Sequence, residues 1–442
     1  MTSINSDFMS QLALRSLGNS SNMMTQAMER LSTGKRVNSA ADDAAGLGIA
    51  TKLRAQVNSL NAATRNATDA LALIGTIDGA LEESSEILLR MRELAVQSAS
   101  DTNTGTDRSF IQDEINALNN ELNRISSSTE FNSVKLLDGT YNNKQIQIGT
   151  GANQVFNIGV TATDSSTLGA YELESKSEAT SATASATTAD AKINALVTAS
   201  ADYTVKGSFG SAEIKVDGGA DAKDVAQSFN LSSGTTGITA TAITKANITA
   251  ISKATTISFT LKGKSDTAST VNATITSISN LTALKDAINS VSGATGISAS
   301  LTTDLSGINL VQQDGFDIVI GGVSTTATAT MSVDAADKSG VGVGNVQALG
   351  GTTTTDSIGI IGQVSLSSHK AFTVAPGVAT NHFSTGTTAE TSSLQSMGKV
   401  DISSQVGATK ALSVIDGAIA MISEVRSEMG AAENRLTSTV DN

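Results

Sequence analysis

The fold is decided by residues 53–95, which read LRAQVNSLNAATRNATDALALIGTIDGALEESSEILLRMRELA. Apolar side chains recur every seven residues through this stretch, at Leu53, Leu60, Ala67, Ile74, Leu81, Leu88 and Ala95. A seven-residue repeat keeps an apolar seam on one side of an α-helix and is typical of coiled coils. We expect one helix over residues 44–99, about 80 Å long at roughly 1.5 Å per residue. A helix of that length needs partners along its side.

Three further segments have helical spacing. In residues 4–33 apolar side chains step by three and four, and Gly34 follows as the usual residue just past a helix end. The second helix is expected to start with Ser39 as its N-cap and Asp42 three residues later. Short loops make neighbouring helices antiparallel. The three stripes are Leu14, Leu17, Met24, Met28 and Leu31; Ile111, Ile115, Leu118, Leu122 and Ile125; and Leu412, Ile415, Ile419, Ile422, Met429, Leu436 and Val440.

The middle of the chain differs in composition. Arginine occurs only in residues 15–124 and 426–435, and Thr, Ser, Ala and Gly dominate between them. Alternating apolar residues predict a β-hairpin that ends near Val160, and short runs of Val, Ile, Thr and Phe predict strands in residues 161–396. In this insertion, the sequence around Lys223–Ser228 resembles that around Lys285–Ser290. We therefore expect two related modules, at about 200–250 and 255–325.

The predicted fold class is α+β. A long antiparallel α-helical coiled-coil bundle is formed from both chain ends, with a β-hairpin and an inserted β-rich variable region. The predicted parts are an N-terminal helix and connector (1–43), a helical core domain (44–160 and 397–442) and the insertion (161–396). A hairpin tip tolerates an insertion, whereas the interior of a heptad helix does not.

Composition excludes several classes of function. The formal net charge of −13 disfavours a sequence-independent grip on nucleic acid or on an anionic membrane. The chain has no Cys, which excludes thiolate metal sites, cysteine nucleophiles and disulfides. The first residues do not form a basic segment followed by an apolar stretch, and no run of about 18 apolar residues is present. We expect neither a cleaved signal nor a membrane anchor.

No pattern predicts an enzyme. The two histidines, His369 and His382, lack the His-Glu-x-x-His spacing that places two imidazoles on one helical face. Neighbouring carboxylates such as Asp42 and Asp43 point in different directions on a helix and make a poor acid–base pair. Residues 340–344 are rich in glycine but lack the lysine and helix start of a phosphate-binding loop. We expect no catalytic residue, no metal ion and no cofactor.

Four segments resemble the signature segments of bacterial flagellins. The longest is Leu31–Ala50, LSTGKRVNSAADDAAGLGIA, and the others are Leu88–Gln97, Phe131–Gly139 and Gly430–Leu436. The repeated Gly-Ile-Ser/Thr-Ala units also resemble flagellin hook-type insertion modules. The resemblance covers about residues 1–140 and 400–442. It implies a structural subunit that self-assembles into the flagellar filament for motility, with terminal helices inside the tube and the insertion outside.

The resemblance also implies partners and a location. The partners would be other flagellin subunits in a homo-oligomer, a flagellar chaperone, the type III export apparatus and the filament cap. The protein would be secreted and extracellular, with residues 1–43 in the inner layer of the filament. Flagellins continue past the Asn-Arg-Leu motif with a further terminal helix that pairs with the N-terminal helix. Because this sequence ends at Val440-Asp-Asn442, we expect residues 4–33 to lie without that partner.

A receptor surface is implied as well. In flagellins, Toll-like receptor 5 recognises this part of the second helix. Arg90, Leu94 and Gln97 lie at i, i+4 and i+7 on one helical face, and Glu114 is expected opposite them on the third helix. Filament packing is an alternative role for the same residues. Leu89 stands where the family more often has Gln, which would weaken receptor binding.

Two interpretations of the apolar seam stay open, a core private to the chain and a contact surface between subunits. Two other classes of function also stay open. One is a hook–filament junction protein, which shares helical termini with flagellins, and the other is a surface adhesin or glycan-bearing binding module built on the Ser/Thr-rich insertion. The predicted seam residues are Leu17, Met24, Leu31, Leu53, Leu60, Ile74, Leu81, Leu88, Ile422 and Leu436.

Overall fold

A computed structural model describes residues 3–175, 178–182, 200–265, 267–326, 328–350, 356–378, 382–383 and 387–441. The chain forms two compact units. The first contains the residues up to Thr76, Asn142–Gly159 and the residues from Met429 onward. The second contains Ile77–Tyr141 and Val160–Glu428.

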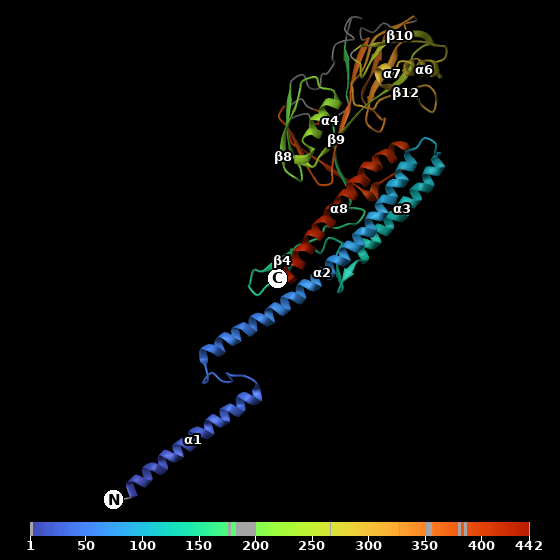
Figure 1. The fold of residues 1–442 in the computed structure, drawn as a ribbon. Helices are drawn as coiled ribbons and strands as arrows, with labels where there is room; N and C mark the ends of the chain where they lie inside the picture. The colour runs from blue at the N-terminus through green and yellow to red at the C-terminus, as the bar shows by residue number, and fades with distance from the viewer. Residues whose placement is uncertain are drawn as a thin grey trace. The chain divides into compact units, whose positions relative to one another are not determined.

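Four long helices come from the two chain ends, as expected (Figure 1). They are α1 (Ser3–Thr33), α2 (Ala44–Ala99), α3 (Gly105–Ser128) and α8 (Gln405–Asp441). Thr104 caps α3 in a reciprocal capping box with Asp107. The mixed helix and strand fold class is thereby confirmed.

The predicted N-cap of α2 is wrong. The helix begins after Asp43, whose Oδ1 accepts a hydrogen bond from the Gly46 amide at 2.8 Å. Ser39 and Asp42 instead close a separate turn, in which Asp42 Oδ2 accepts from the Ser39 amide at 3.0 Å. Both sequence positions fit a capping pattern, and the competing acceptor Asp43 lies one residue nearer the helix.

The helical part of the second unit is an antiparallel bundle. Ion pairs join α2 to α8 at Arg92–Asp416 (2.6 Å) and at Asp78–Arg426 (2.8 Å), so α8 runs in the opposite direction to α2. Figure 1 shows α3 beside them. The interior of the bundle is aliphatic, and its fully buried side chains include Ile77, Leu81, Leu88, Met91, Ile115, Leu122 and Ile415. A short hairpin, β1 (Glu130–Phe131) with β2 (Val134–Lys135), follows α3.

The predicted β-hairpin lies in the first unit, as β3 (Lys144–Gln147) and β4 (Val155–Ile158). The Asn66 side chain of α2 donates to the Gln147 carbonyl at 3.0 Å. The Arg435 guanidinium of α8 lies 5.0 Å from the centre of the Phe156 ring. The hairpin is therefore fixed to helices from both ends of the chain.

The insertion is built from antiparallel sheets. A five-stranded sheet has the order β11–β10–β14–β17–β6, and a four-stranded sheet has the order β20–β19–β7–β8. The third sheet runs β12–β13–β9–β18–β5–β21, with β15 also paired to β9 and β16 paired to β15. The strands are β5 (Gly169–Glu174), β6 (Glu178–Ala182), β7 (Ala201–Lys206), β8 (Ser211–Val216), β9 (Thr239–Ile251), β10 (Thr255–Lys262), β11 (Ser269–Ile275), β12 (Ile297–Leu301), β13 (Ile308–Gln312), β14 (Ile318–Thr325), β15 (Met331–Ala336), β16 (Gly342–Leu349), β17 (Ser357–Ile361), β18 (Gln363–Ser368), β19 (Thr373–Pro376), β20 (Glu390–Thr391) and β21 (Ser393–Ser396).

Two hydrophobic cores lie within these sheets. One contains Ile257, Phe259, Leu284 and Ile320, and the other contains Tyr203, Phe229, Val364 and Phe372. Short helices cover each core. The first core is covered by α6 (Thr282–Ser290) with α7 (Ser292–Thr295), and the second by α4 (Ala222–Leu231) with α5 (Ser233–Thr236). At the base of the insertion β5 pairs with β21, so that Gly169 lies opposite Ser396. This pairing brings the two ends of the insertion together.

The two modules repeat the same local structure. In the first, the Asn230 side chain accepts from the Ala240 amide and donates to the Ala240 carbonyl, both at 2.8 Å. In the second, Asn289 makes the same two bonds to Ala299, at 2.8 and 2.9 Å. Gly237 and Gly296 follow the helices with φ of +72° and +70°, a backbone conformation that favours glycine.

Helix α8 is long and apolar enough to cross a membrane by length and composition, with a window of mean hydropathy 1.4. The core helices of soluble proteins meet the same criteria. Two charged side chains of α8, Asp416 and Arg426, form ion pairs with α2 within the bundle.

Candidate assembly surface

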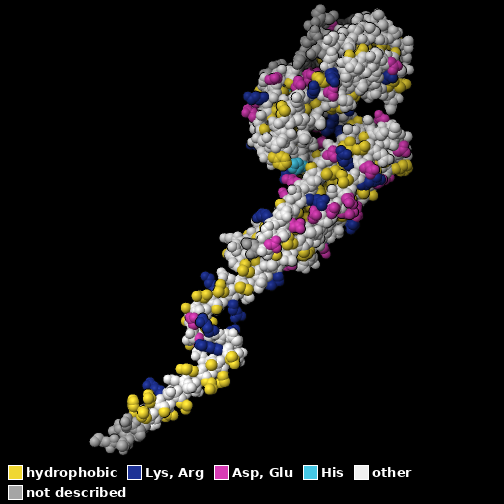
Figure 2. Space-filling view, viewed as in Figure 1, with side chains coloured by type: hydrophobic (Ala, Val, Ile, Leu, Met, Phe, Trp, Pro, Cys, Tyr) yellow, Lys and Arg dark blue, Asp and Glu magenta, His cyan; other side chains and the backbone are white. Residues whose placement is uncertain are grey.

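Helix α1 presents large apolar side chains to solvent. Figure 2 shows them gathered over α1 and the first part of α2. The predicted seam residues Leu17, Met24 and Leu31 are 69%, 63% and 88% exposed. Exposed apolar patches of this kind mark surfaces that other molecules cover. Their neighbours on the helix, also exposed, are Phe8, Met9, Leu12, Leu14, Met23 and Met28.

The heptad seam of α2 changes environment along its length. Leu53 and Leu60 are exposed, at 54% and 53%. From Ala63 onward the seam is buried, and Ile74, Leu81 and Leu88 are each at most 1% exposed. Ile422 and Leu436 of α8 are buried to the same degree. One sequence repeat therefore serves as chain interior at one end and as exposed surface at the other.

The position of α8 explains the change. Its ion pairs with α2 set an antiparallel register, in which residues toward the C-terminus of α8 lie beside residues toward the N-terminus of α2. Both helices rise by the same distance per residue, so this register can be extended to the end of α8. It places Asp441 beside about residues 63–67 of α2. The seam N-terminal to that point has no helix from the described residues beside it.

The turn between α1 and α2 carries the polar residues of the 31–50 segment. Asp42 Oδ1 accepts from the Gln26 side chain at 2.7 Å, and the Arg30 guanidinium lies 3.9 Å away. Hydrogen bonds from the Ser39 amide, and then from Gln26, lower the pKa of Asp42 to about 2. Thr33 donates to the Asn38 side chain at 2.9 Å. These bonds hold the turn next to the apolar surface in one conformation.

The predicted receptor residues are only partly brought together. Arg90 donates to Glu114 at 2.8 and 3.0 Å and to Glu93 at 2.5 Å, and Gln97 is exposed. Leu94, however, is 1% exposed. The expectation that Leu94 belongs to the receptor surface with Arg90 and Gln97 is wrong. Leu94 lies one helical turn from Met91 and Ser98, and both of these side chains are buried in the bundle.

The exposed face around Arg90 includes Leu89, which the family resemblance singled out, and two further apolar residues that the sequence analysis did not name. Leu89 and Val96 of α2 are 55% and 50% exposed, and Phe110 of α3 is 67% exposed. Phe110 lies one turn before Glu114 on α3, so it shares a face with the Arg90 partner. The sequence did indicate the exposure of these three residues, because they fall outside the heptad positions that are buried.

The two histidines lie in different surroundings. His382 is buried, its Nδ1 lies 2.9 Å from the Tyr203 hydroxyl, and burial lowers its pKa to about 4. His369 lies 3.4 Å from Glu424 of α8 and beside the Phe209 ring. Across the residues that the structure describes, no three His, Cys, Asp or Glu side chains gather in a way that could hold a metal ion.

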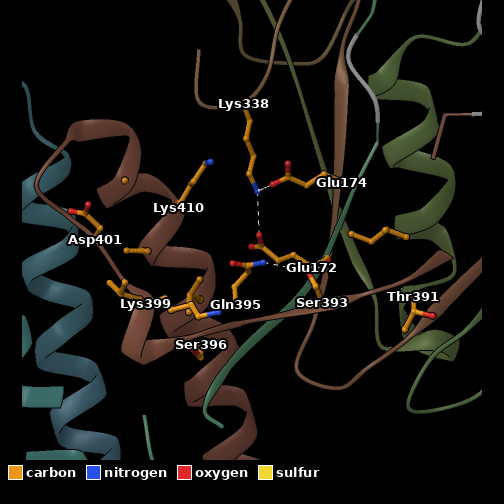
Figure 3. A pocket seen from close by; sticks show the side chains of 15 residues that line it. Glu172, Glu174, Lys338, Thr391, Ser393, Gln395, Ser396, Lys399, Asp401 and Lys410 are labelled. Atoms are coloured by element: carbon orange, nitrogen blue, oxygen red, sulfur yellow. Dashed lines mark hydrogen bonds and ion pairs between the residues drawn. The ribbon is translucent and has the colours of Figure 1, made fainter. Parts of the chain in front are cut away.

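A cleft of about 570 Å³ lies between the start of α8 and the base of the insertion (Figure 3). Lys338 lies in it between Glu172 and Glu174 and forms an ion pair with each. Lys410 of α8 points toward the same place and donates to the Ser339 hydroxyl. The sequence pattern gave no sign of this cluster, because its members come from three separate stretches of the chain, at residues 172–174, 338–339 and 410.

The sequence is similar to known flagellar proteins. Residues 4–142 match the family model of the bacterial flagellin N-terminal helical region, and residues 256–314 match that of the flagellin hook IN motif. B-type flagellin of Pseudomonas aeruginosa is 33% identical over 443 residues, which is 99% of this chain and 88% of that protein. The chain belongs to the bacterial flagellin family. Flagellins are structural proteins that form the extracellular filament of the bacterial flagellum, and this function class was predicted from the signature segments.

Other flagellins match over shorter parts of the chain. Clostridium tyrobutyricum flagellin is 56% identical over 137 residues, 31% of this chain and 36% of that protein. Halalkalibacterium halodurans flagellin is 44% identical over 165 residues, 37% of this chain and 61% of that protein. The hook IN match covers most of the second module, and the first module has the same order of strands and helices.

Solved structures are matched at low TM-scores. FliC from Burkholderia pseudomallei has 15% identity and a TM-score of 0.33, over 83% of this chain and 99% of that one. Flagellar hook-associated protein 3 from Legionella pneumophila has 14% identity and a TM-score of 0.34, over 88% of this chain and 93% of that one. Assignment to the flagellin family therefore rests on the sequence matches.

Proposed function

We propose that this flagellin is a filament subunit that polymerises with other copies of itself for motility. The observation that carries the proposal is the exposure of Leu17, Met24 and Leu31 on α1 and of Leu53 and Leu60 on α2. Such large apolar side chains, on helices with a polar turn between them, are costly to leave in water. Burial against neighbouring subunits removes that cost.

The proposed division of labour follows the three predicted parts. Residues 1–43 form the inner layer of the filament, residues 44–160 and 397–442 form the helical core domain, and residues 161–396 lie outside as the variable insertion. The pairing of Gly169 with Ser396 supports this division, because it closes the insertion at its base. Replacing residues 165–392 by a short Gly/Ser linker is expected to leave a cooperative helical melt by circular dichroism. Collapse to coil would contradict the division.

Assembly is tested with polar substitutions on α1. Purified chains carrying Leu17→Gln, Met24→Gln and Leu31→Gln together are expected to stay monomeric under salt conditions in which the parent chain forms filaments visible by electron microscopy. The control is Phe209→Gln, since Phe209 is 64% exposed but lies in the insertion. Normal filaments from the triple variant, or loss of filaments in the control, would contradict the proposal.

Other flagellar proteins are proposed partners on the family resemblance. A dedicated chaperone would bind the subunit before export, the type III export apparatus would pass it out of the cell, and the filament cap would guide its addition. The exposed apolar helices support the need for a chaperone, because such surfaces promote aggregation of free subunits.

Binding of Toll-like receptor 5 is a second proposed function. It is supported by the exposed face that contains Arg90, Gln97 and Glu114 on a rigid bundle. Arg90→Ala is expected to reduce receptor activation in reporter cells. Arg124→Ala is the matched control, because Arg124 forms a similarly exposed ion pair with Glu121 within α3. Equal activation by both variants would contradict a role for the Arg90 face.

A further inference from the structure

The turn that joins β15 to β16, Asp337–Val341, is closed by its own hydrogen bonds. The Asp337 amide donates to the Val341 carbonyl at 2.9 Å. The Asp337 side chain accepts from the amides of Ser339 and Val341, at 2.7 and 3.0 Å. Gly340 has φ of +83°, which other residues rarely adopt. The turn is thus a stiff projection rather than a loose loop.

Three strands of the insertion bind this turn. From β9, Lys245 donates to the Lys338 carbonyl at 2.7 Å and Asn247 donates to the Gly340 carbonyl at 3.2 Å. From β18, the Gln363 side chain accepts from the Lys338 amide at 2.7 Å. From β5, Glu172 and Glu174 form ion pairs with Lys338 Nζ.

Helix α8 binds the same turn from the other side. Lys410 donates to the Ser339 hydroxyl, and Ser413 donates to Glu172 at 2.7 Å. Glu172 therefore accepts from α8 through one oxygen and from Lys338 through the other. The helical part and the insertion share one carboxylate.

The charges in this cluster are well shielded from solvent. The side chains of Lys338 and Glu172 are 15% and 10% exposed. Burial by itself lowers the pKa of Lys338, but the charges of Glu172 and Glu174 and their hydrogen bonds outweigh it and raise that pKa. Removing one member would leave partly buried charges without a partner, which costs far more than losing an exposed ion pair.

The cluster lies where the two modules meet. Strand β9 pairs with β18 through Thr239–Ile243 and with β13 through Thr244–Ile248, so Lys245 marks the change from one module to the other. The cleft beside it, lined by Glu172, Lys338 and Lys410 together with Ala411 and Val414, shows that side chains do not fill this junction completely. The polar contacts of the turn bridge it.

We propose that the turn Asp337–Val341 is an ionic latch that holds both β modules in one orientation on α8. A further polar contact joins the insertion to α8, where Glu424 binds Lys370 at 2.5 Å and His369 at 3.4 Å. This contact reaches only the first module. Opening the latch leaves the second module able to swing about its junction with the first module while both modules stay folded.

The test measures the distance between two spin labels, one on α8 and one on β11 of the second module. The chain has no Cys, so Ser427→Cys on α8 and Asn272→Cys on β11, both exposed positions, can be spin-labelled without background. The latched parent is expected to give one narrow distance distribution by pulsed electron resonance. Lys338→Met is expected to broaden it. The matched control is Lys264→Met, because Lys264 pairs with Asp314 at 3.9 Å and these side chains are 63% and 54% exposed.

Two results of the comparison between Lys338→Met and the parent would overturn the latch. One is a distance distribution in Lys338→Met with the same width and the same mean distance as in the parent. The other is a parent distribution as broad as that of the variant. Circular dichroism reports whether Lys338→Met keeps its β structure. If it does not, Lys410→Met decides, since Lys410 lies on α8 outside the β cores. An unchanged distribution in Lys410→Met would then overturn the proposal.

Discussion

Arg90 of α2 donates from Nε and Nη2 to the same oxygen of Glu114 on α3, at 3.0 and 2.8 Å. Both side chains remain nearly half exposed, at 46% and 44%. Leu94, one turn further along α2, is by contrast enclosed in the bundle. Residues that one helical pattern groups together are therefore divided between surface and core.

This division predicts opposite effects of two substitutions. Leu94→Ala is expected to lower the free energy of unfolding of the helical part by about 2–5 kcal/mol, because it leaves a cavity in a packed interior. Arg90→Ala is expected to leave the unfolding midpoint nearly unchanged, because exposed ion pairs contribute little. Denaturant unfolding followed by helical circular dichroism checks both. A larger loss for Arg90→Ala than for Leu94→Ala would contradict the burial of Leu94.

The seam of α2 supplies a matched pair of leucines. Leu81 and Leu53 occupy the same heptad position, yet Leu81 is fully buried and Leu53 is 54% exposed. In the monomer, Leu81→Ala is expected to destabilise the bundle by about 2–5 kcal/mol. Leu53→Ala is expected to have no measurable effect on monomer unfolding. Equal losses would mean that the seam is buried along its whole length.

The paired hydrogen bonds of Asn230 to Ala240 and of Asn289 to Ala299, which we call the asparagine clamps, predict equivalent behaviour of the two modules. Asn230→Ala leaves the amide and carbonyl of Ala240 without their side-chain partner, and Asn289→Ala does the same at Ala299. Each is expected to cost about 1–3 kcal/mol of unfolding free energy. Asn272→Ala, at an exposed position on β11, is the control and should unfold as the parent does. A clamp variant as stable as this control would show that the clamp does not hold its strand.

His382 predicts loss of stability in acid. Burial lowers its pKa from 6.5 to about 4, so the unfolded chain takes up a proton at higher pH than the folded chain does. The contribution of His382 is complete above pH 6.5 and is lost as the pH falls from 6.5 toward 4. The total loss is on the order of 3 kcal/mol, since one pKa unit corresponds to about 1.4 kcal/mol.

Thermal unfolding between pH 7 and pH 4 measures this effect. His382→Gln is expected to show a shallower decline than the parent. A parent curve with no steeper decline than that of His382→Gln would contradict the burial of a neutral imidazole.

The helices were predictable because their signals are local and repeated. The bounds 44–99 for α2 follow from spacing, and the hairpin near Val160 follows from alternation. Burial was not predictable at the same level, because Leu53 and Leu81 have the same local pattern and differ only in whether α8 reaches them. The Ser39 cap failed for a similar reason, since Asp43 offered an equally good acceptor nearer the helix.

The latch residues could not be found from the sequence. Glu172, Lys245, Lys338 and Lys410 are far apart in the chain, and each is an ordinary charged residue in its own segment. Only the pairing of β9 with β15 and β18, together with the position of α8, brings them to one place. Such clusters depend on tertiary contacts that leave no periodic signal.

The most direct test of the assembly surface is its chemical protection on polymerisation. Because the chain has no Cys, Met24→Cys, Leu60→Cys and Phe209→Cys each carry one thiol at a position that is 63%, 53% and 64% exposed in the monomer. All three should react quickly with a maleimide before assembly. In filaments, Met24→Cys and Leu60→Cys should become unreactive while Phe209→Cys still reacts. If the thiols on α1 and α2 label as quickly in filaments as in monomers, these helices are not the surface through which subunits assemble.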